Sequence, residues 1–236
     1  IFYKEGGIEM VKVVVSLPEE RVKRYGVKPP EGFQLEYITS PYTDEELIKA
    51  SEGATFLFLS LSPASRNVIE NLKTVKLIQS EGVGFDGIDT EAAKEAGIYV
   101  CNAKGVNKVA VAEHAIGLML AALRRTAEAD KEIKKGNFVS SYRDYEEKGI
   151  RELESCHVGL VGLGDIGKEV AKRLKPFNCK VSYYDVFRQP KEVEEDLGLN
   201  FMSFEDVCTD CDIISLHLPL LPSTEGLINK DAINLM

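Results

Sequence analysis

Three glycines spaced G-x-G-x-x-G interrupt the stretch GLVGLGDIGKEVAKRL, between a short apolar run and an amphipathic run with helical periodicity. In a strand–turn–helix unit, Gly162 permits the tight turn and Gly164 lets the backbone approach a pyrophosphate. Gly167, the third, lets the helix pack close to the strand. The first helical residues, Asp165 and Ile166, then present free N–H groups to the phosphates. The stretch predicts a dinucleotide-binding turn.

An acidic residue stands where such a turn needs one. Asp185 closes the next strand-like run, KVSYYD, 18 residues after Gly167. A carboxylate at this position accepts hydrogen bonds from ribose hydroxyls and repels a 2′-phosphate, so NAD is predicted rather than NADP. Arg188 follows closely and would suit a phosphate, but beside Asp185 we interpret it as a surface arginine lining the adenine cleft.

Short β-branched or aromatic runs alternate with helical patterns along most of the chain. The strands are predicted at residues 11–16, 33–38, 55–60, 76–80 and 98–102, then at 157–162, 180–185, 200–202 and 212–218. Helical patterns lie between them, including TDEELIKAS, in which Thr43 and Glu46 have the spacing of a capping box. Strand–helix alternation with short links is typical of parallel sheets.

The pattern changes after Asn102. An unusually long helical signal covers residues 107–138, and the following RDYEEKGI is interpreted as a loop before the alternation resumes. The predicted fold class is therefore α/β, with two Rossmann-like or flavodoxin-like parallel-sheet units joined by a long helix and the second unit truncated. Residues 1–9 precede the first predicted strand as an extension.

Composition excludes several classes of partner. The formal net charge is −9 and the sequence holds no block of lysine and arginine, which argues against nucleic acid or an anionic membrane as partner. The longest apolar stretch, AIGLMLAAL, is too short to span a bilayer, and the N-terminal residues lack the pattern of a signal peptide. We expect a cytoplasmic protein.

The five cysteines are interpreted as reduced thiols. Cys208 and Cys211 form a C-x-x-C, which allows a redox pair or half of a zinc site. No second C-x-x-C or H-x₃₋₅-H completes a zinc site. We therefore favour two small apolar residues where a helix gives way to a strand.

Four ordered motifs resemble one family. EGVGFDGID, NAKGVNKVAVAEHAIGLMLAALRR, VGLVGLGDIG and SLHLPLLPSTEGLIN look like stretches of the NAD-dependent D-isomer-specific 2-hydroxyacid dehydrogenases. The resemblance implies a substrate domain at residues 1–103, in its N-terminal part, and an NAD-binding Rossmann domain at 104–236, incomplete at its C-terminus. It implies hydride transfer between NAD and a small anionic 2-hydroxy or 2-oxo acid, and we expect a homodimer.

The resemblance also implies roles for individual residues. The N–H groups of Val83 and Gly84 would bind the substrate carboxylate, and Val111 would line the nicotinamide pocket. The residues that would line the cofactor cleft beyond the last strand are His217, Leu218, Pro219 and Thr224. Two residues depart from the family pattern: Glu81 stands just before the carboxylate-binding loop, and Lys104, which could offset that charge, replaces a usual proline.

The family's catalytic arginine, glutamate and histidine follow the stretch that matches INKDAINLM, where this sequence ends. No residue present is therefore assigned a catalytic role, and the 236-residue chain alone is predicted to be inactive. His217 belongs to the cofactor side, His114 is interpreted as a helix-packing or capping residue, and His157 shows no catalytic context.

Two alternatives remain open at this point. One is an NAD-binding interaction protein on the same scaffold, like the transcriptional corepressors that resemble these dehydrogenases. The other is an adenosylmethionine-dependent methyltransferase, whose glycine loop and acidic residue look similar. The α/β unit before the long helix and the SLHLPL segment count against the methyltransferase.

Overall fold

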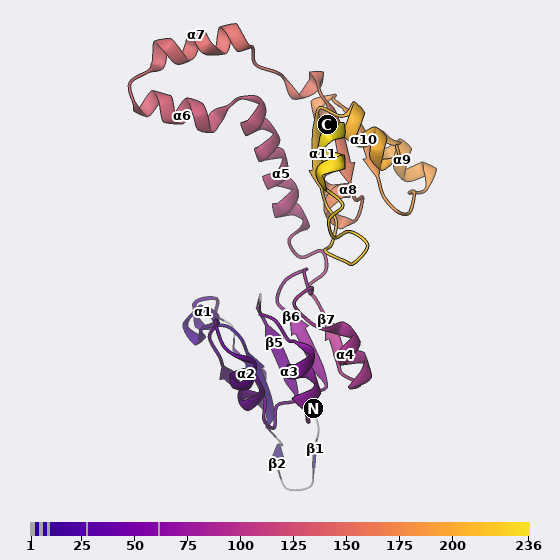
Figure 1. The fold of residues 1–236 in the computed structure, drawn as a ribbon. Coiled ribbons are helices and arrows are strands. Elements are labelled where there is room, and N and C mark those ends of the chain that lie inside the picture. Colours follow the sequence, from indigo (N-terminus) through magenta and orange to yellow (C-terminus); the bar gives the residue numbers. More distant parts are fainter. Residues whose placement is uncertain (1–2, 5–6, 9, 27, 61) are drawn as a thin grey trace. The chain divides into compact units, whose positions relative to one another are not determined.

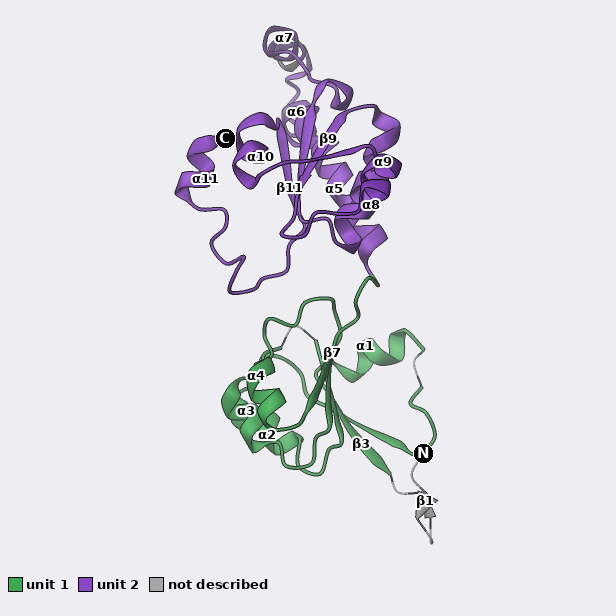
Figure 2. Ribbon diagram, turned by 90° about the vertical axis from the view of Figure 1, so that its right-hand side faces the viewer, with its two compact units in different colours: residues 1–106 green, residues 107–236 purple. Residues whose placement is uncertain are grey.

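The structure is a computed structural model that describes residues 3–4, 7–8, 10–26, 28–60 and 62–236 (Figure 1). The chain divides into two compact units, residues 1–106 and residues 107–236 (Figure 2). Within the expected N-terminal extension, β1 (Tyr3–Lys4) pairs antiparallel with β2 (Gly7–Ile8), and the rest of that extension lies outside the described residues.

Unit 1 is built on a five-stranded sheet in the order β4-β3-β5-β6-β7, and every neighbouring pair is parallel. Its strands are β3 (Val11–Val15), β4 (Phe33–Tyr37), β5 (Phe56–Leu59), β6 (Leu77–Ser80) and β7 (Tyr99–Cys101). All five were predicted from their short apolar runs. The carboxyl ends of these strands share one edge, which is where ligands bind in open parallel sheets.

Three helices cover one face of this sheet and one lies on the other (Figure 2). They are α2 (Asp44–Ala50), α3 (Arg66–Asn71) and α4 (Thr90–Glu95) on the first face and α1 (Glu19–Arg24) on the second. The predicted capping box is confirmed: Thr43 Oγ1 accepts from the N–H of Glu46 at 3.3 Å, and Glu46 Oε2 accepts from the N–H of Thr43 at 2.8 Å. The six-residue helices α1 and α3 were not predicted from the sequence.

Unit 2 carries the glycine cluster on a four-stranded parallel sheet. Its strands are β8 (His157–Val161), β9 (Lys180–Tyr184), β10 (Leu199–Phe201) and β11 (Ile213–Leu216). Their spatial order is β10-β9-β8-β11, which is the 3-2-1-4 order of a Rossmann half with a fourth strand beyond it. Every residue of β8 is buried, so the glycines follow the most protected strand of the sheet.

Helices cover both faces of the second sheet (Figure 2). One face carries α5 (Lys108–Leu123), α8 (Asp165–Leu174) and α9 (Lys191–Leu197), and the other carries α10 (Phe204–Asp210). The remaining elements are the 3₁₀ turns η1 (Leu153–Ser155) and η2 (Lys175–Phe177) and the helix α11 (Lys230–Leu235). None of the helices in the described part of the chain is long and apolar enough to cross a membrane.

The long helical stretch predicted at 107–138 is in fact broken, and the loop predicted after it is wrong. After α5, the chain forms α6 (Thr126–Lys134) and then α7 (Phe138–Lys148), which occupies most of RDYEEKGI (Figure 1). The break falls at Arg125, whose φ of 48° is left-handed and ends the hydrogen-bond pattern of α5.

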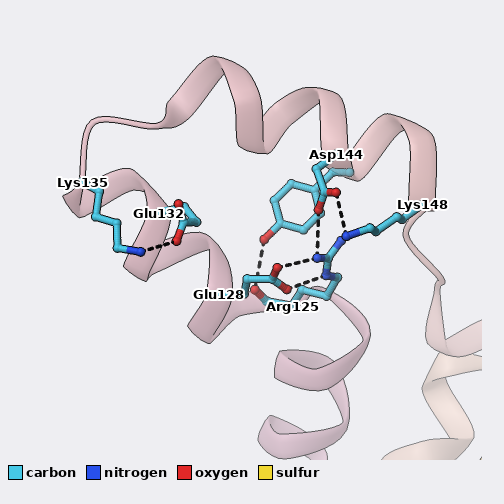
Figure 3. Close-up of polar contacts among 7 residues, drawn as sticks. Arg125, Glu128, Glu132, Lys135, Asp144 and Lys148 are labelled. Atoms are coloured by element: carbon cyan, nitrogen blue, oxygen red, sulfur yellow. Dashed lines mark hydrogen bonds and ion pairs between the residues drawn. The ribbon is translucent and has the colours of Figure 1, made fainter.

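Side chains from α7 hold this break in place (Figure 3). The Arg125 guanidinium donates to both carboxylate oxygens of Glu128, at 2.7 and 2.6 Å, and to Asp144 Oδ2 at 2.9 Å. It also lies 4.8 Å from the centre of the Tyr145 ring, whose hydroxyl donates to the Arg125 carbonyl at 3.2 Å. Because Asp144 and Tyr145 are about 20 residues away in the sequence, local helical periodicity carries no sign of the break.

Candidate functional site

The glycine turn has two positions that the fold itself restricts to glycine and one that it does not. At Gly162, φ is 96°, and an added Cβ would lie 2.6 Å from the carbonyl oxygen of His217 and 2.9 Å from Leu218 Cδ2. A Cβ on Gly167 would collide with the carbonyl of Gly162. Gly164, by contrast, precedes α8 and faces open space, with no atom of the described chain within 4 Å of an added Cβ. The open space at Gly164 is therefore available to a bound group.

Asp185 connects this turn to the loop after β9. Its Oδ2 accepts the N–H of Leu163 at 2.7 Å, and its Oδ1 accepts the N–H of Phe187 at 3.2 Å. A carboxylate offers about four acceptor positions, so two remain for ribose hydroxyls. The sequence predicted the acid but not its second role, which is to fix the glycine turn.

The segment after β11 lies beside the glycine turn. The N–H of His217 donates to the Val161 carbonyl at 2.8 Å and so continues the pairing of β11 with β8. Its Nε2 is 2.9 Å from Ser215 Oγ, and burial lowers the pKa of the imidazole below its ordinary value. The ring is thus neutral at neutral pH, and its role on the cofactor side remains a prediction.

The other predicted cofactor residues lie near this segment or on α5. Thr224 Oγ1 donates to the Pro219 carbonyl at 2.6 Å and accepts the N–H of Leu221 at 2.9 Å, so it closes the loop that Pro219 begins. Val111 is half-buried on α5, the helix that packs along α8. Their contacts with a cofactor remain predictions.

In unit 1, three hydrogen bonds to the backbone carbonyls of the loop after β6 hold that loop in place. The carbonyls of Gly82, Val83 and Gly84 accept from the N–H of Ala103 at 2.9 Å, Asn102 Nδ2 at 2.7 Å and Ser80 Oγ at 2.6 Å. Among the hydrogen bonds of the described residues, neither the Val83 nor the Gly84 N–H donates. Successive N–H groups of this kind are suited to bind an anion.

Ser80 and Asn102 were not singled out from the sequence. Each stands at or just after the carboxyl end of a strand, Ser80 in β6 and Asn102 after β7, and these strands are neighbours in the sheet. The positions of these polar residues relative to the strand ends were the available signal. Their side chains orient the loop, and its N–H groups are left to a ligand.

The charge of Glu81 is compensated within unit 1. Arg21 Nη2, from α1, lies 3.0 Å from Glu81 Oε1, and Ser60 Oγ donates to Glu81 Oε2. Lys104, which the sequence offered for this task, is an exposed residue elsewhere on the loop surface. The neutralising cation is therefore Arg21, which comes from a helix that the sequence did not predict.

The remaining histidines differ in their surroundings. His157 is buried, with Nε2 2.8 Å from Ser182 Oγ and Nδ1 3.1 Å from the Asp210 carbonyl, so both ring nitrogens serve packing within unit 2. His114 is exposed on α5.

The C-x-x-C packs as one buried and one half-buried thiol. Cys208 is buried and Cys211 half-buried, and burial raises the pKa of both thiols, that of Cys211 to about 11. The Sγ of Cys211 lies 2.9 Å from the position of a Cβ on Gly159, so it fills space against β8. A raised pKa opposes thiolate chemistry, which favours the packing role over a redox pair.

We expect Cys101 to be alkylated first among the five thiols. It is the exposed cysteine, whereas the other four are buried or half-buried. Brief treatment of the folded protein with iodoacetamide, followed by peptide mass spectrometry, should label Cys101 well before Cys208 or Cys211. Rapid labelling of Cys211 would instead indicate a reactive pair.

A comparison with protein families assigns unit 2. The family model described as D-isomer specific 2-hydroxyacid dehydrogenase, NAD binding domain, matches residues 116–236, which include β8 to β11 and the glycine turn. The chain belongs to this family. Its cofactor is NAD, and the open space at Gly164 and the free acceptor positions of Asp185 fit the pyrophosphate and the ribose.

Individual relatives cover most of the chain. The D-3-phosphoglycerate dehydrogenase of Methanocaldococcus jannaschii is 37% identical over 230 residues, which are 96% of this chain and 42% of that protein. The glyoxylate reductase of Thermococcus litoralis is 33% identical over 234 residues, or 98% of this chain and 66% of that protein. This chain therefore spans 42% and 66% of the lengths of these two relatives.

A solved structure agrees with the fold. The D-lactate dehydrogenase of Aquifex aeolicus, in complex with NAD and lactic acid, matches with a TM-score of 0.80 and 28% identity. The match covers 95% of this chain and 66% of that one. Both parallel sheets of this chain thus follow the architecture of 2-hydroxyacid dehydrogenases.

Proposed function

We propose that this chain is part of an enzyme that reduces a small 2-oxo acid to the D-2-hydroxy acid with NADH. The observation that carries the proposal is the pair of free N–H groups at Val83 and Gly84, held by Ser80 and Asn102 in a unit that accompanies an NAD-binding domain. Two successive N–H groups that donate to no acceptor among the described residues suit the carboxylate of such a substrate. The bound cofactor supplies a hydride to C2 of the acid.

The reaction also needs a proton donor for the C2 oxygen and a cation for the developing charge. We propose that these groups, an arginine and a histidine oriented by a glutamate, belong to residues outside the 236 of this chain. In support, His157 uses both ring nitrogens within unit 2, and His217 is kept neutral beside Ser215. The 236-residue chain alone then binds NADH without turning over a 2-oxo acid.

The assay follows NADH at 340 nm with glyoxylate, pyruvate and hydroxypyruvate. We expect the 236-residue chain to quench NADH fluorescence on binding and to show no oxidation of NADH. A chimera that carries the C-terminal remainder of the Thermococcus litoralis relative should oxidise NADH with at least one of the three acids. Oxidation by the 236-residue chain itself would refute the placement of the proton donor.

Asn102→Ala in the active chimera isolates the role of the loop. Loss of the Nδ2 bond to the Val83 carbonyl frees the loop to turn, so the KM for the acid should rise about tenfold with NADH affinity unchanged.

The chimera also distinguishes the alternative functions. Nucleotide-dependent oligomerisation of the chimera without oxidation of NADH would favour the corepressor-like alternative. Binding of adenosylmethionine in place of NADH would contradict both.

We also propose that the protein forms a homodimer through the α6–α7 hairpin. This hairpin exposes large apolar side chains that a monomer would leave in water: Ile133, Phe138, Val139 and Tyr142. Each is more than half exposed, and apolar surface that is grouped in this way is typical of protein contacts. The isologous contact of a two-fold dimer would bury the same patch on both copies.

Phe138→Asp together with Val139→Asp should dissociate this dimer. Both residues lie in the first turn of α7, where an acidic side chain is favourable to the helix, so the hairpin itself is preserved. Sedimentation velocity should show a dimer for the original protein and a dissociation constant at least about tenfold weaker for the variant. The exposed Glu146→Gln serves as the control, and a dimer that survives the double variant would place the contact elsewhere.

A further inference from the structure

The loop after β9 contains an arginine, Arg188, whose guanidinium is already paired with a carboxylate. Arg188 Nε donates to Glu194 Oε1 and Nη2 donates to Glu194 Oε2, both at 2.9 Å, so the two groups meet in a bidentate pair. Glu194, on α9, is only 7% exposed, whereas the side chain of Arg188 is 62% exposed. The buried carboxylate thus holds an otherwise free guanidinium.

Further contacts make this arrangement rigid. Tyr183 Oη donates to Glu194 Oε1 at 2.7 Å and accepts the N–H of Gln189 at 2.8 Å. The guanidinium carbon of Arg188 lies 5.3 Å from the centre of the Phe201 ring. The hydrogen bonds from Arg188 and Tyr183 lower the pKa of Glu194 to about 2, so the pair remains ionised throughout the neutral range.

The pair lies where the two nicotinamide cofactors differ. Arg188 follows Asp185 by three residues, in the loop that borders the adenine ribose of a Rossmann domain. A 2′-phosphate on that ribose would need a cation from this loop. The next basic residue, Lys191, lies 3.4 Å from Glu195 in an exposed pair.

We propose that Glu194 is a cofactor-specificity residue, because it withholds Arg188 from a 2′-phosphate. Selection of NAD then rests on two carboxylates with different tasks. At the position expected for the ribose, Asp185 would repel a phosphate. Glu194 occupies the Nε and Nη2 donors of Arg188, which a phosphate would otherwise engage. Removal of the charge on Glu194 releases the guanidinium and should strengthen the binding of NADP relative to that of NAD.

Glu194→Gln tests this directly. The amide has the same size and can still accept the Tyr183 hydroxyl, but it no longer attracts both donors of Arg188. Fluorescence titration with NADH and NADPH should show the ratio of the NADPH to the NADH dissociation constant falling by about tenfold, with the NADH constant within about twofold. Adenosine 2′,5′-bisphosphate and 5′-AMP should show the same change in competition, which locates it at the ribose.

Two further variants test whether the change in the ratio comes from the Arg188 guanidinium. Arg188→Met added to Glu194→Gln should return the ratio to its original value, because the released cation is gone. Glu192→Gln removes an equal charge from an exposed residue of α9 and should change neither constant. Should Glu194→Gln lower the melting temperature too far for titration, Glu194→Met releases the same guanidinium with an apolar side chain of similar volume.

An unchanged ratio in a folded Glu194 variant would overturn the proposal. A gain in NADPH affinity that persists after Arg188→Met would also overturn it, because the gain would then arise from something other than the guanidinium. All of these readouts are binding constants, so they do not depend on whether the chain turns over a 2-oxo acid.

Discussion

Alanine at Gly162 is expected to destabilise unit 2, whereas alanine at Gly164 is expected to leave it stable and weaken NADH binding. A Cβ at Gly162 would lie 2.6 Å from the His217 carbonyl oxygen at a φ of 96°. Overpacking and backbone strain together cost about 3 kcal/mol or more. Calorimetry should record a fall in melting temperature of roughly 10 °C.

Gly164→Ala meets no atom of the described chain within 4 Å and lies at a φ of −74°, so the fold tolerates it. The methyl group enters the space that the pyrophosphate would occupy, and NADH affinity should fall about tenfold in a fluorescence titration. Gly117→Ala, on the exposed side of α5, is the matched control and should raise stability by about 1 kcal/mol without affecting NADH. Equal NADH affinity in Gly164→Ala and the original protein would argue against a pyrophosphate at this turn.

Asp185→Ala should weaken NADH binding more than any other single substitution of a charged residue in unit 2. The carboxylate holds the N–H groups of Leu163 and Phe187, and its remaining lone pairs face the ribose in the proposed complex. Hydrogen bonds to a charged group contribute about 1.5–3 kcal/mol each, so the loss should reach about 100-fold in the dissociation constant. Isothermal titration with NADH measures it.

Asp185→Asn separates the two tasks of this side chain. The amide oxygen can still accept the N–H of Leu163, so the turn is retained and the loss of affinity should be several-fold smaller. Glu205→Ala, an exposed acid on α10, controls for net charge. If the alanine and asparagine variants bind NADH as tightly as the original protein, the assignment of the ribose to Asp185 is wrong.

Structural features that depend only on residues close together in the sequence could be predicted from it. The strands of both sheets are short runs rich in β-branched or aromatic residues, and the capping box at Thr43 and Glu46 needs only residues three apart. The glycine turn and Asp185 follow from spacing, because a strand, a tight turn and a helix impose their requirements over a few residues. These local rules predicted the fold class and the cofactor.

Features that depend on residues far apart in the sequence could not be predicted from it. The break at Arg125 is held by Asp144 and Tyr145, and helical periodicity across the break gave no warning of it. Glu81 gains its cation from Arg21, 60 residues earlier in the chain. Each of these contacts depends on how separate helices and strands pack.

The sequence by itself thus predicted the NAD turn and the residue types around it, because glycine spacing and strand–helix alternation are short-range constraints. The family followed from the resemblance of four ordered motifs. Only the tertiary structure decided what each polar group does. It directs the carbonyls of Val83 and Gly84 toward Asn102 and Ser80, and it binds Arg188 to the buried carboxylate of Glu194. A buried charge requires a partner, and the fold can bring that partner from any point along the chain. Its position in the sequence therefore follows no fixed spacing.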